Sequence, residues 1–165
     1  MFVAMADQPG EPSKPAKARR LPRILLAEDQ EYVLAAIAAF LQERYSDRYE
    51  IVGTVRDGTA LVRETLRLAP DVAVVDITIP GLNGLEATSE LTRRNCGTRV
   101  VILTMNWETE FLDAALAAGA IGYVLKHRMV TDLPDAIDAA LQGKRFISSS
   151  VQNTQERISK RPRQE

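Results

Sequence analysis

The chain has 165 residues, of which 45% are hydrophobic and 26% charged, with a formal net charge of −1. This length suits one ordinary domain, and the composition is that of a globular protein without an apolar run of about 18 residues that could span a membrane. The single cysteine, Cys96, excludes an internal disulfide and fits a reducing cytoplasm.

Charge is unevenly distributed along the chain. Residues 1–23 carry five Lys or Arg against two acids, and residues 143–165 carry six against two. Residues 24–142 are therefore acidic overall, and an acidic body binds nucleic acid poorly, so we expect no direct nucleic-acid binding. The basic ends are interpreted as solvated tails, with contact to an acidic partner as the alternative.

Residues 1–21 are rich in Pro, Lys and Ala and lack an apolar period, which predicts a disordered basic tail. Five short apolar runs then alternate with helical patterns. The first run, residues 24–27, ends at Glu28 and Asp29. The helix after it is predicted from apolar side chains at helical spacing: Val33, Leu34, Ile37, Phe40 and Leu41.

The second run covers residues 49–55 and precedes a helix that is predicted to stop near Pro70. The third run, residues 72–76, ends with Asp76. A Pro-Gly pair and an Asn-Gly pair within residues 80–84 then predict a loop, and a further helix follows the loop.

The fourth run, residues 100–104, ends with Thr104 and precedes a helix over about residues 108–117. The fifth run, residues 121–125, ends at Lys126. Each of these two runs therefore places a polar side chain with hydrogen-bonding capacity directly at its carboxyl end.

The last predicted helix has Thr131 or Asp132 as its N-cap and Pro134 in its first turn, where a missing N–H costs little. After Gly143 the sequence has no apolar period beyond residues 146–147. We therefore expect the chain to fray after Gly143.

Four of the five strand runs are continuously apolar, which is typical of strands that are buried on both faces of a parallel sheet. Alternation of strands with helices predicts a doubly wound α/β fold with right-handed crossovers. A strand order of 2-1-3-4-5 brings the polar ends of the first, third, fourth and fifth strands together. Ligands of open parallel sheets bind beyond this edge.

The predicted edge gathers Glu28, Asp29, Asp76, Thr104 and Lys126. Three carboxylates that lie close together stay ionised only beside a strong cation, and one lysine does not balance them. Oxygen ligands of this kind select a hard divalent ion such as Mg²⁺. Such a cation and Lys126 together would also neutralise the charge of a phosphoryl group, toward which an aspartate is a competent nucleophile.

These residues resemble the receiver domain of bacterial response regulators, most closely receivers of the NarL/FixJ subfamily. The resemblance covers about residues 23–145 and implies a flavodoxin-like (βα)5 sandwich. It implies a receiver domain over 22–145. Receivers of this subfamily usually carry a DNA-binding domain, but residues 146–165 are too few for one and are interpreted as a short basic tail without an output domain. The matching segments are Leu-Ala-Glu-Asp at 26–29, Val-Asp-Ile-Thr-Ile-Pro-Gly-Leu-Asn-Gly at 75–84, Val-Ile-Leu-Thr at 101–104 and Gly-Tyr-Val-Leu-Lys at 122–126.

By this resemblance, Asp76 is the phosphoacceptor. Asp29, Asp76 and the backbone carbonyl of Thr78 are implied to bind Mg²⁺, with Glu28 acting through a water molecule. Lys126 is implied to contact the phosphoryl group. The chemistry implied for the chain itself is limited to autophosphorylation and slow autodephosphorylation.

The resemblance also implies a switch in which Thr104 supplies a hydroxyl and Tyr123 an aromatic ring. Phosphorylation draws the hydroxyl toward the new charge, the ring follows inward, and the face of the fourth helix, fifth strand and fifth helix changes its binding preference. The implied phosphodonor is a sensor histidine kinase or phosphotransfer protein in the cytoplasm. The implied target is an unidentified protein or a second copy of the phosphorylated chain.

Three alternatives stay open. The chain could be a phosphorylation-independent interaction module, or the receiver of a transcriptional regulator whose DNA-binding domain is absent from it. An aspartyl phosphohydrolase is disfavoured because such enzymes usually carry a second acid where this chain has Thr78. His127 is interpreted as a surface residue rather than a phosphorelay histidine, and Trp107 as either a partner contact or a packing residue.

Overall fold

The computed structural model describes residues 19–152 and residue 156. The predicted N-terminal tail lies outside this part of the chain except for its last three residues, and so does most of the basic C-terminal end. In chain order the elements are β1 (Arg23–Ala27), α1 (Glu31–Tyr45), β2 (Glu50–Val55), α2 (Gly58–Leu68), β3 (Val72–Val75), α3 (Gly84–Arg93), β4 (Arg99–Thr104), α4 (Thr109–Ala118), β5 (Gly122–Leu125), the 3-10 turn η1 (Lys126–Arg128), α5 (Met129–Leu141) and β6 (Phe146–Ile147).

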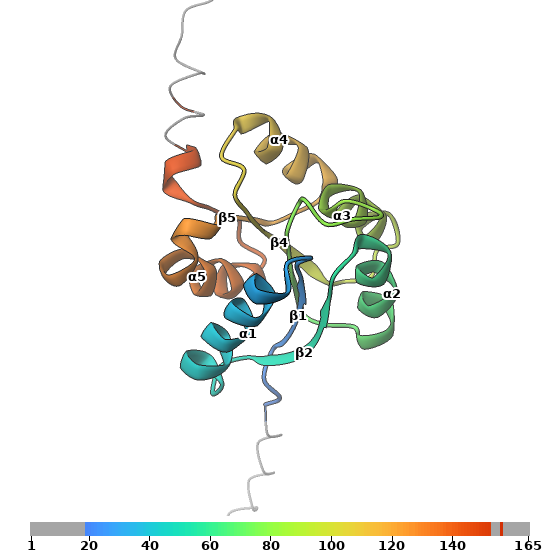
Figure 1. The fold of residues 1–165 in the computed structure, drawn as a ribbon, viewed down its shortest axis with the longest axis vertical. Helices are drawn as coiled ribbons and strands as arrows, with labels where there is room; N and C mark the ends of the chain where they lie inside the picture. Colours follow the sequence, from blue (N-terminus) through green and yellow to red (C-terminus); the bar gives the residue numbers. More distant parts are fainter. Residues whose placement is uncertain (1–18, 153–155, 157–165) are drawn as a thin grey trace, which may run out of the picture.

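The strands within the described residues form one parallel sheet in the order β2-β1-β3-β4-β5-β6 (Figure 1). The predicted doubly wound, flavodoxin-like fold and the order 2-1-3-4-5 are therefore confirmed, and a short sixth strand extends the sheet. β3 and β5 are buried along their whole length, which explains their continuously apolar sequences.

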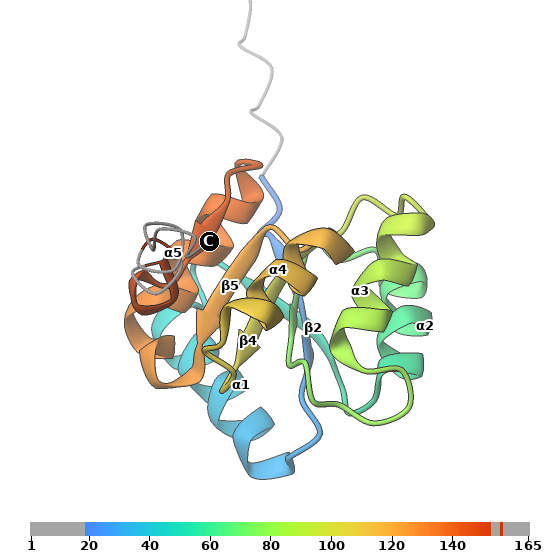
Figure 2. The same ribbon diagram turned by 90° about the horizontal axis from the view of Figure 1, so that it is seen from above.

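Helices cover both faces of the sheet. α1 and α5 lie on one side, and α2 and α3 lie on the other (Figure 2). Leu41 and Ile137 belong to the core on the first side, whereas Leu61, Leu91 and Leu112 share the core on the second. Among the described residues, no helix combines the length and the apolar character that a membrane crossing requires.

The starts of α2 and α3 follow local sequence signals. The Asp57 carboxylate accepts a hydrogen bond of 2.7 Å from the backbone N–H of Ala60, which caps α2. The Asn83 side chain caps α3, and the Glu86 carboxylate accepts in return from the Asn83 N–H at 3.0 Å, which completes a capping box. The Asn-Gly signal thus fixes where the loop after Asp76 ends.

The predicted start of the last helix is wrong. α5 begins at Met129, directly after η1, and Arg128 takes the N-cap position. Asp132 therefore lies inside the helix as a buried residue, and Pro134 lies within the helix rather than in its first turn. A Lys-His-Arg sequence carries no capping side chain, so no local signal marked the true start.

The expectation that the chain frays after Gly143 is wrong for residues 146–152. β6 pairs with β5 in parallel register, with Tyr123 opposite Ile147. Ser148 donates its backbone N–H to the Tyr123 carbonyl at 2.9 Å, and the side chains of Ser148 and Val151 are fully buried. A two-residue strand is too short to produce a periodic signal, so the sequence could not reveal it.

Candidate functional site

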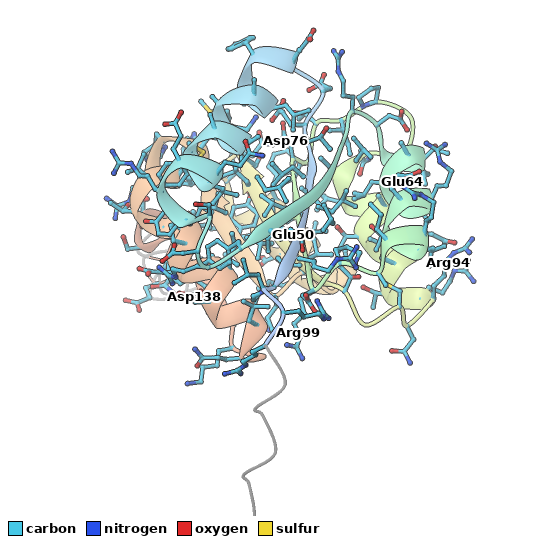
Figure 3. The ribbon with its side chains drawn as sticks, turned by 90° about the horizontal axis from the view of Figure 1, so that it is seen from below. Glu50, Glu64, Asp76, Arg94, Arg99 and Asp138 are labelled. Atoms are coloured by element: carbon cyan, nitrogen blue, oxygen red, sulfur yellow. The ribbon has the colours of Figure 1, made fainter. Side chains whose placement is uncertain are left out.

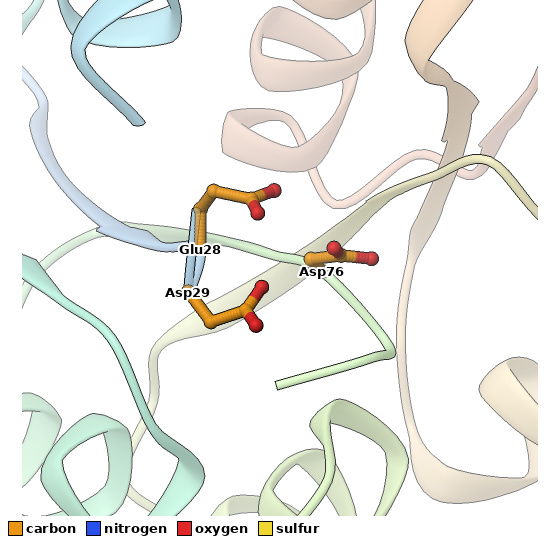
Figure 4. A group of neighbouring side chains, drawn as sticks. All are labelled: Glu28, Asp29 and Asp76. Carbon is orange, nitrogen blue, oxygen red and sulfur yellow. The ribbon is translucent and has the colours of Figure 1, made fainter. Parts of the chain in front are cut away.

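Three carboxylates meet at the carboxyl end of the sheet. Glu28 and Asp29 follow β1, and Asp76 follows β3, so the parallel pairing of these neighbouring strands brings them together (Figure 4). Each residue offers an oxygen within 4.8 Å of the others. Asp76 lies at one end of the sheet and Arg99, the first residue of β4, at the other (Figure 3).

The carboxylate cluster is largely buried. Glu28 is 1% exposed and Asp76 is 4% exposed, whereas Asp29 is partly exposed. The Asp76 backbone N–H donates to the Ala27 carbonyl at 3.0 Å, which continues the pairing of β1 and β3 past the end of β3. The carboxylate of Asp76 is thus held by the sheet, which keeps its position well defined.

Lys126 bridges two of the three carboxylates. Its ammonium group donates to Glu28 Oε2 at 2.6 Å and to Asp76 Oδ2 at 2.9 Å. Burial disfavours the charged form of Lys126, but the bonds to both carboxylates outweigh it and raise the pKa of the lysine. Lys126 is therefore a stable cation between Glu28 and Asp76.

The two oxygens of Asp76 differ in their surroundings. Oδ2 accepts from Lys126 and from the Thr78 hydroxyl, the latter at 3.1 Å. Oδ1 accepts only the long 3.4 Å contact from the Thr78 backbone N–H among the hydrogen bonds of the described residues. Oδ1 is thus the less engaged oxygen of the carboxylate.

Glu28 is bound from two sides. Its Oε1 accepts the backbone N–H of Gln30 at 3.1 Å, while its Oε2 accepts from Lys126. Burial is the main cause that raises the pKa of Glu28, against the lowering effect of these hydrogen bonds. The Arg56 guanidinium holds the Asp29 carbonyl by two bonds of 2.8 and 3.0 Å. Arg56 could not be predicted as part of the site, because its partner is a backbone atom.

Thr104 and Tyr123 form a second group beside this cluster, linked by Asn106. The Thr104 hydroxyl accepts from the backbone N–H and the side-chain amide of Asn106, both at 3.2 Å. The Tyr123 hydroxyl donates to the Asn106 carbonyl at 2.8 Å, and both Thr104 and Tyr123 are fully buried. The predicted site residues therefore separate into a charged group and a neighbouring hydroxyl group.

The charged group fits a hard divalent cation. The carboxylates of Glu28, Asp29 and Asp76 supply oxygen donors at short mutual distances. One lysine, Lys126, faces these three carboxylates. Clustered carboxylate oxygens are the donors that Mg²⁺ prefers in a protein site.

Gly84 brings the start of α3 against the Asp76 segment. Its backbone N–H donates to the Ile77 carbonyl at 2.8 Å. A β-carbon at this position would lie 2.2 Å from the Asp76 carbonyl oxygen and 2.8 Å from the Ile77 Cα. Only glycine permits this approach, and the approach defines the path of the chain from Asp76 to α3.

Comparisons with known proteins show the family of the chain. The chain matches the response regulator receiver domain family over residues 24–138. It is 35% identical to the transcriptional regulatory protein YvfU of Bacillus subtilis over 129 residues, which are 78% of this chain and 64% of YvfU. The chain spans less than two thirds of the length of YvfU, of LiaR of Bacillus subtilis and of GacA of Pseudomonas viridiflava.

Solved structures show the same fold. A LuxR-family two-component response regulator from Aurantimonas superposes with a TM-score of 0.77 at 31% identity, over 84% of this chain and 99% of that one. The isolated receiver domain of RcsB from Salmonella enterica, solved with the phosphomimetic BeF3⁻, superposes with a TM-score of 0.72 at 30% identity, over 81% of this chain and 98% of that one.

Proposed function

The chain belongs to the response regulator receiver domain family, and from this premise we propose that it accepts a phosphoryl group on Asp76. The proposed donor is a phosphohistidine of a sensor histidine kinase or phosphotransfer protein in the cytoplasm. The single observation that carries this proposal is the Lys126 ammonium bound to both Asp76 and Glu28 within a recessed carboxylate cluster. A purely structural ion pair between Lys126 and Asp76 would not need Glu28 and Asp29 beside it.

In the proposed reaction, an oxygen of the Asp76 carboxylate attacks the donor phosphorus. The phosphorus–nitrogen bond breaks, and its electron pair stays on the donor imidazole. Oδ1 is the oxygen that attacks, because Oδ2 already accepts from Lys126 and Thr78. The recessed position of Asp76 limits the approach of water to the acyl phosphate.

The charges of the site support transfer. Lys126 carries three N–H donors. Two of them bind Glu28 and Asp76 Oδ2, so the third can serve a phosphoryl oxygen after transfer. Glu28 keeps the ammonium group in place through its 2.6 Å bond. Mg²⁺ would supply the remaining positive charge for the phosphoryl oxygens. Asp29, Asp76 and the Thr78 carbonyl would hold it, with Glu28 acting through a water molecule.

The two other candidate activities are less well supported. A phosphorylation-independent module has no need of a lysine with a raised pKa between two buried acids. An aspartyl phosphohydrolase would place a general acid two residues after the nucleophile. Here Thr78 occupies that position and its hydroxyl donates to Asp76.

Mass spectrometry of the intact protein tests the phosphoacceptor. With Mg²⁺ and acetyl phosphate, the wild-type chain is expected to gain about 80 Da, the mass of one phosphoryl group, through an acyl phosphate. Asp76→Asn should gain no such mass, because an amide oxygen is a poor nucleophile. Asp47→Asn, which changes an exposed aspartate outside the cluster, is the matched control and should behave as wild type. A phosphorylated Asp76→Asn variant would place the acceptor elsewhere.

We propose that phosphorylation is read out through Thr104, Asn106 and Tyr123. A phosphoryl oxygen competes with Asn106 for the Thr104 hydroxyl, and Asn106 is also bonded to Tyr123. Trp107 follows Asn106 and is 59% exposed, so it reports on this loop. The downstream protein, or a second phosphorylated copy, binds the face between α4 and α5. β6 contributes to that face because it lies along the outer edge of β5.

Fluorescence of Trp107, the chain's one tryptophan, tests this route. Adding Mg²⁺ and beryllofluoride is expected to shift its emission by several nanometres or change its intensity by tens of per cent, because the loop that carries it rearranges. Asp76→Asn should show no such change. An unchanged signal in a wild-type sample that binds beryllofluoride would refute the readout through Asn106.

The relatives suggest what the switch controls. YvfU is named a transcriptional regulatory protein, and this chain covers 64% of its length. We propose that the chain acts as the receiver of a transcriptional regulator, with DNA binding supplied by residues outside this receiver. The acidic character of residues 24–142 supports this division, because such a body does not bind DNA itself.

A further inference from the structure

Ser148 is a buried polar residue outside the carboxylate cluster. It follows β6 and is fully buried. Its hydroxyl accepts the backbone N–H of Leu125 at 3.2 Å and donates to Asp132 Oδ2 at 2.7 Å. Leu125 is the last residue of β5, so this hydroxyl takes the place of a strand carbonyl one position beyond the end of β6.

Asp132 receives contacts from the turn that precedes α5 and from the start of α5 itself. The carboxylate is buried and accepts from the Thr131 hydroxyl at 3.0 Å and from the Arg128 guanidinium at 3.3 and 3.4 Å. Burial alone would raise the pKa of Asp132, but the bonds from Ser148, Arg128 and Thr131 hold it below its ordinary value. The carboxylate is therefore an anion with partners on both of its oxygens.

These bonds enclose the turn that carries Lys126. The residue before Lys126, Leu125, is bound to Ser148, and the last residue of η1, Arg128, is bound to Asp132. Ser148 and Asp132 are joined by the 2.7 Å bond. Both ends of the Lys126–Arg128 turn are thus attached to one pair of side chains, which lies on the side of β5 away from β4.

The lysine needs such support. Its side chain is long and freely rotating, and it must reach from the end of β5 across β4 to residues at the ends of β1 and β3. Glu28 and Asp76 fix the ammonium group. The position of the Lys126 backbone depends on the turn, and a small displacement there moves the ammonium group away from a phosphoryl oxygen.

We propose that Ser148 and Asp132 are positioning residues that hold Lys126 for the phosphoryl group. This inference depends on the proposed phosphorylation of Asp76 and extends its machinery to a segment beyond α5. The pair touches neither the carboxylate cluster nor the phosphoryl group and acts through the backbone of the Lys126–Arg128 turn.

Binding of beryllofluoride, an acyl-phosphate mimic, tests the proposal by ¹⁹F NMR in the presence of saturating Mg²⁺. Ser148→Ala is expected to weaken beryllofluoride binding by about tenfold, which corresponds to partial loss of one charge-assisted hydrogen bond. Its affinity for Mg²⁺ alone should stay within about twofold of wild type, because Lys126 is not a proposed metal ligand. A purely structural role would not produce this split between the two affinities.

Two further variants separate positioning from general damage. Val151→Ala removes an equally buried side chain from the same segment and should lower stability without changing beryllofluoride affinity. Ser148→Thr keeps the hydroxyl and should restore most of the affinity that Ser148→Ala loses. If Ser148→Ala proves too unstable, Asp132→Asn keeps an acceptor for Ser148 but loses the charge facing Arg128. It should lower the beryllofluoride affinity, again with Mg²⁺ binding preserved.

The possible results distinguish failure of the positioning role from failure of the proposed function. Equal beryllofluoride affinity in wild type, Ser148→Ala and Asp132→Asn would overturn the positioning role while leaving the proposed function intact. Parallel loss of Mg²⁺ and beryllofluoride affinity, or the same loss in Val151→Ala, would reduce the pair to a structural role. A wild-type chain that binds Mg²⁺ but no beryllofluoride would overturn the proposed function itself, and the positioning role with it.

Discussion

The Lys126→Met variant is expected to take up phosphoryl groups from acetyl phosphate at least about 100-fold more slowly than wild type. Methionine keeps much of the length of the side chain but removes the ammonium group that binds both Glu28 and Asp76. Loss of a single well-placed donor to transition-state charge typically costs about two to three orders of magnitude in rate. Rapid-quench sampling with intact-mass detection measures the rate.

The same substitution should lower stability in Mg²⁺-free buffer. Glu28 and Asp76 are almost fully buried, and removing their shared cation leaves two uncompensated carboxylates, which costs about 3 kcal/mol in comparable buried pairs. Added Mg²⁺ should recover part of this loss in urea unfolding, because it supplies a counter-charge. Lys144→Met, at an exposed position outside the site, should change neither rate nor stability. A Lys126→Met variant with wild-type kinetics would remove Lys126 from the mechanism.

Gly84→Ala is expected to destabilise the protein by about 3 kcal/mol and to slow phosphorylation as well. The added β-carbon would lie 2.2 Å from the Asp76 carbonyl oxygen, so backbone atoms rather than a flexible side chain must move. Forced overpacking of this kind costs about 1–3 kcal/mol and more where the backbone cannot yield. The displaced segment carries both Asp76 and Thr78, so the site moves with it.

Gly97→Ala is the matched control for this substitution. Gly97 has a φ of +80° but nothing within 4 Å of an added β-carbon. Its cost should therefore be limited to about 1–2 kcal/mol of backbone strain, and its phosphorylation rate should equal that of wild type. Urea unfolding and the acetyl phosphate assay compare the two variants. Equal effects of both substitutions on rate would mean that contact with the Asp76 segment is not what matters at Gly84.

The sheet and the proximity of the charged residues could be predicted because both follow from simple regularities. Continuously apolar strand runs indicate a parallel sheet, and parallel strands end at one edge. That is why Glu28, Asp76 and Lys126, which are far apart in sequence, could be expected to meet, and the structure places them within hydrogen-bonding distance. Their roles in phosphoryl transfer stay predictions.

Other features could not be predicted because their signals are absent or non-local. The N-cap position of α5 is taken by Arg128, whose side chain cannot cap a helix. Asp132 is not free to cap it, because it is buried against Ser148, which lies 16 residues later in the sequence. Ser148 has no distinguishing neighbours, since it opens a run of three serines. Its importance depends on a hydrogen bond to Leu125, 23 residues earlier, which only the folded chain provides.

β6 also covers β5, which would otherwise be the edge strand of the sheet. Without it, β5 would present unsatisfied N–H and C=O groups beside Tyr123, and such a border attracts strands from other molecules. A shortened gene product that stops at residue 145 should therefore self-associate even though it retains every residue of the carboxylate cluster. β6 covers this part of the β5 edge by backbone pairing alone.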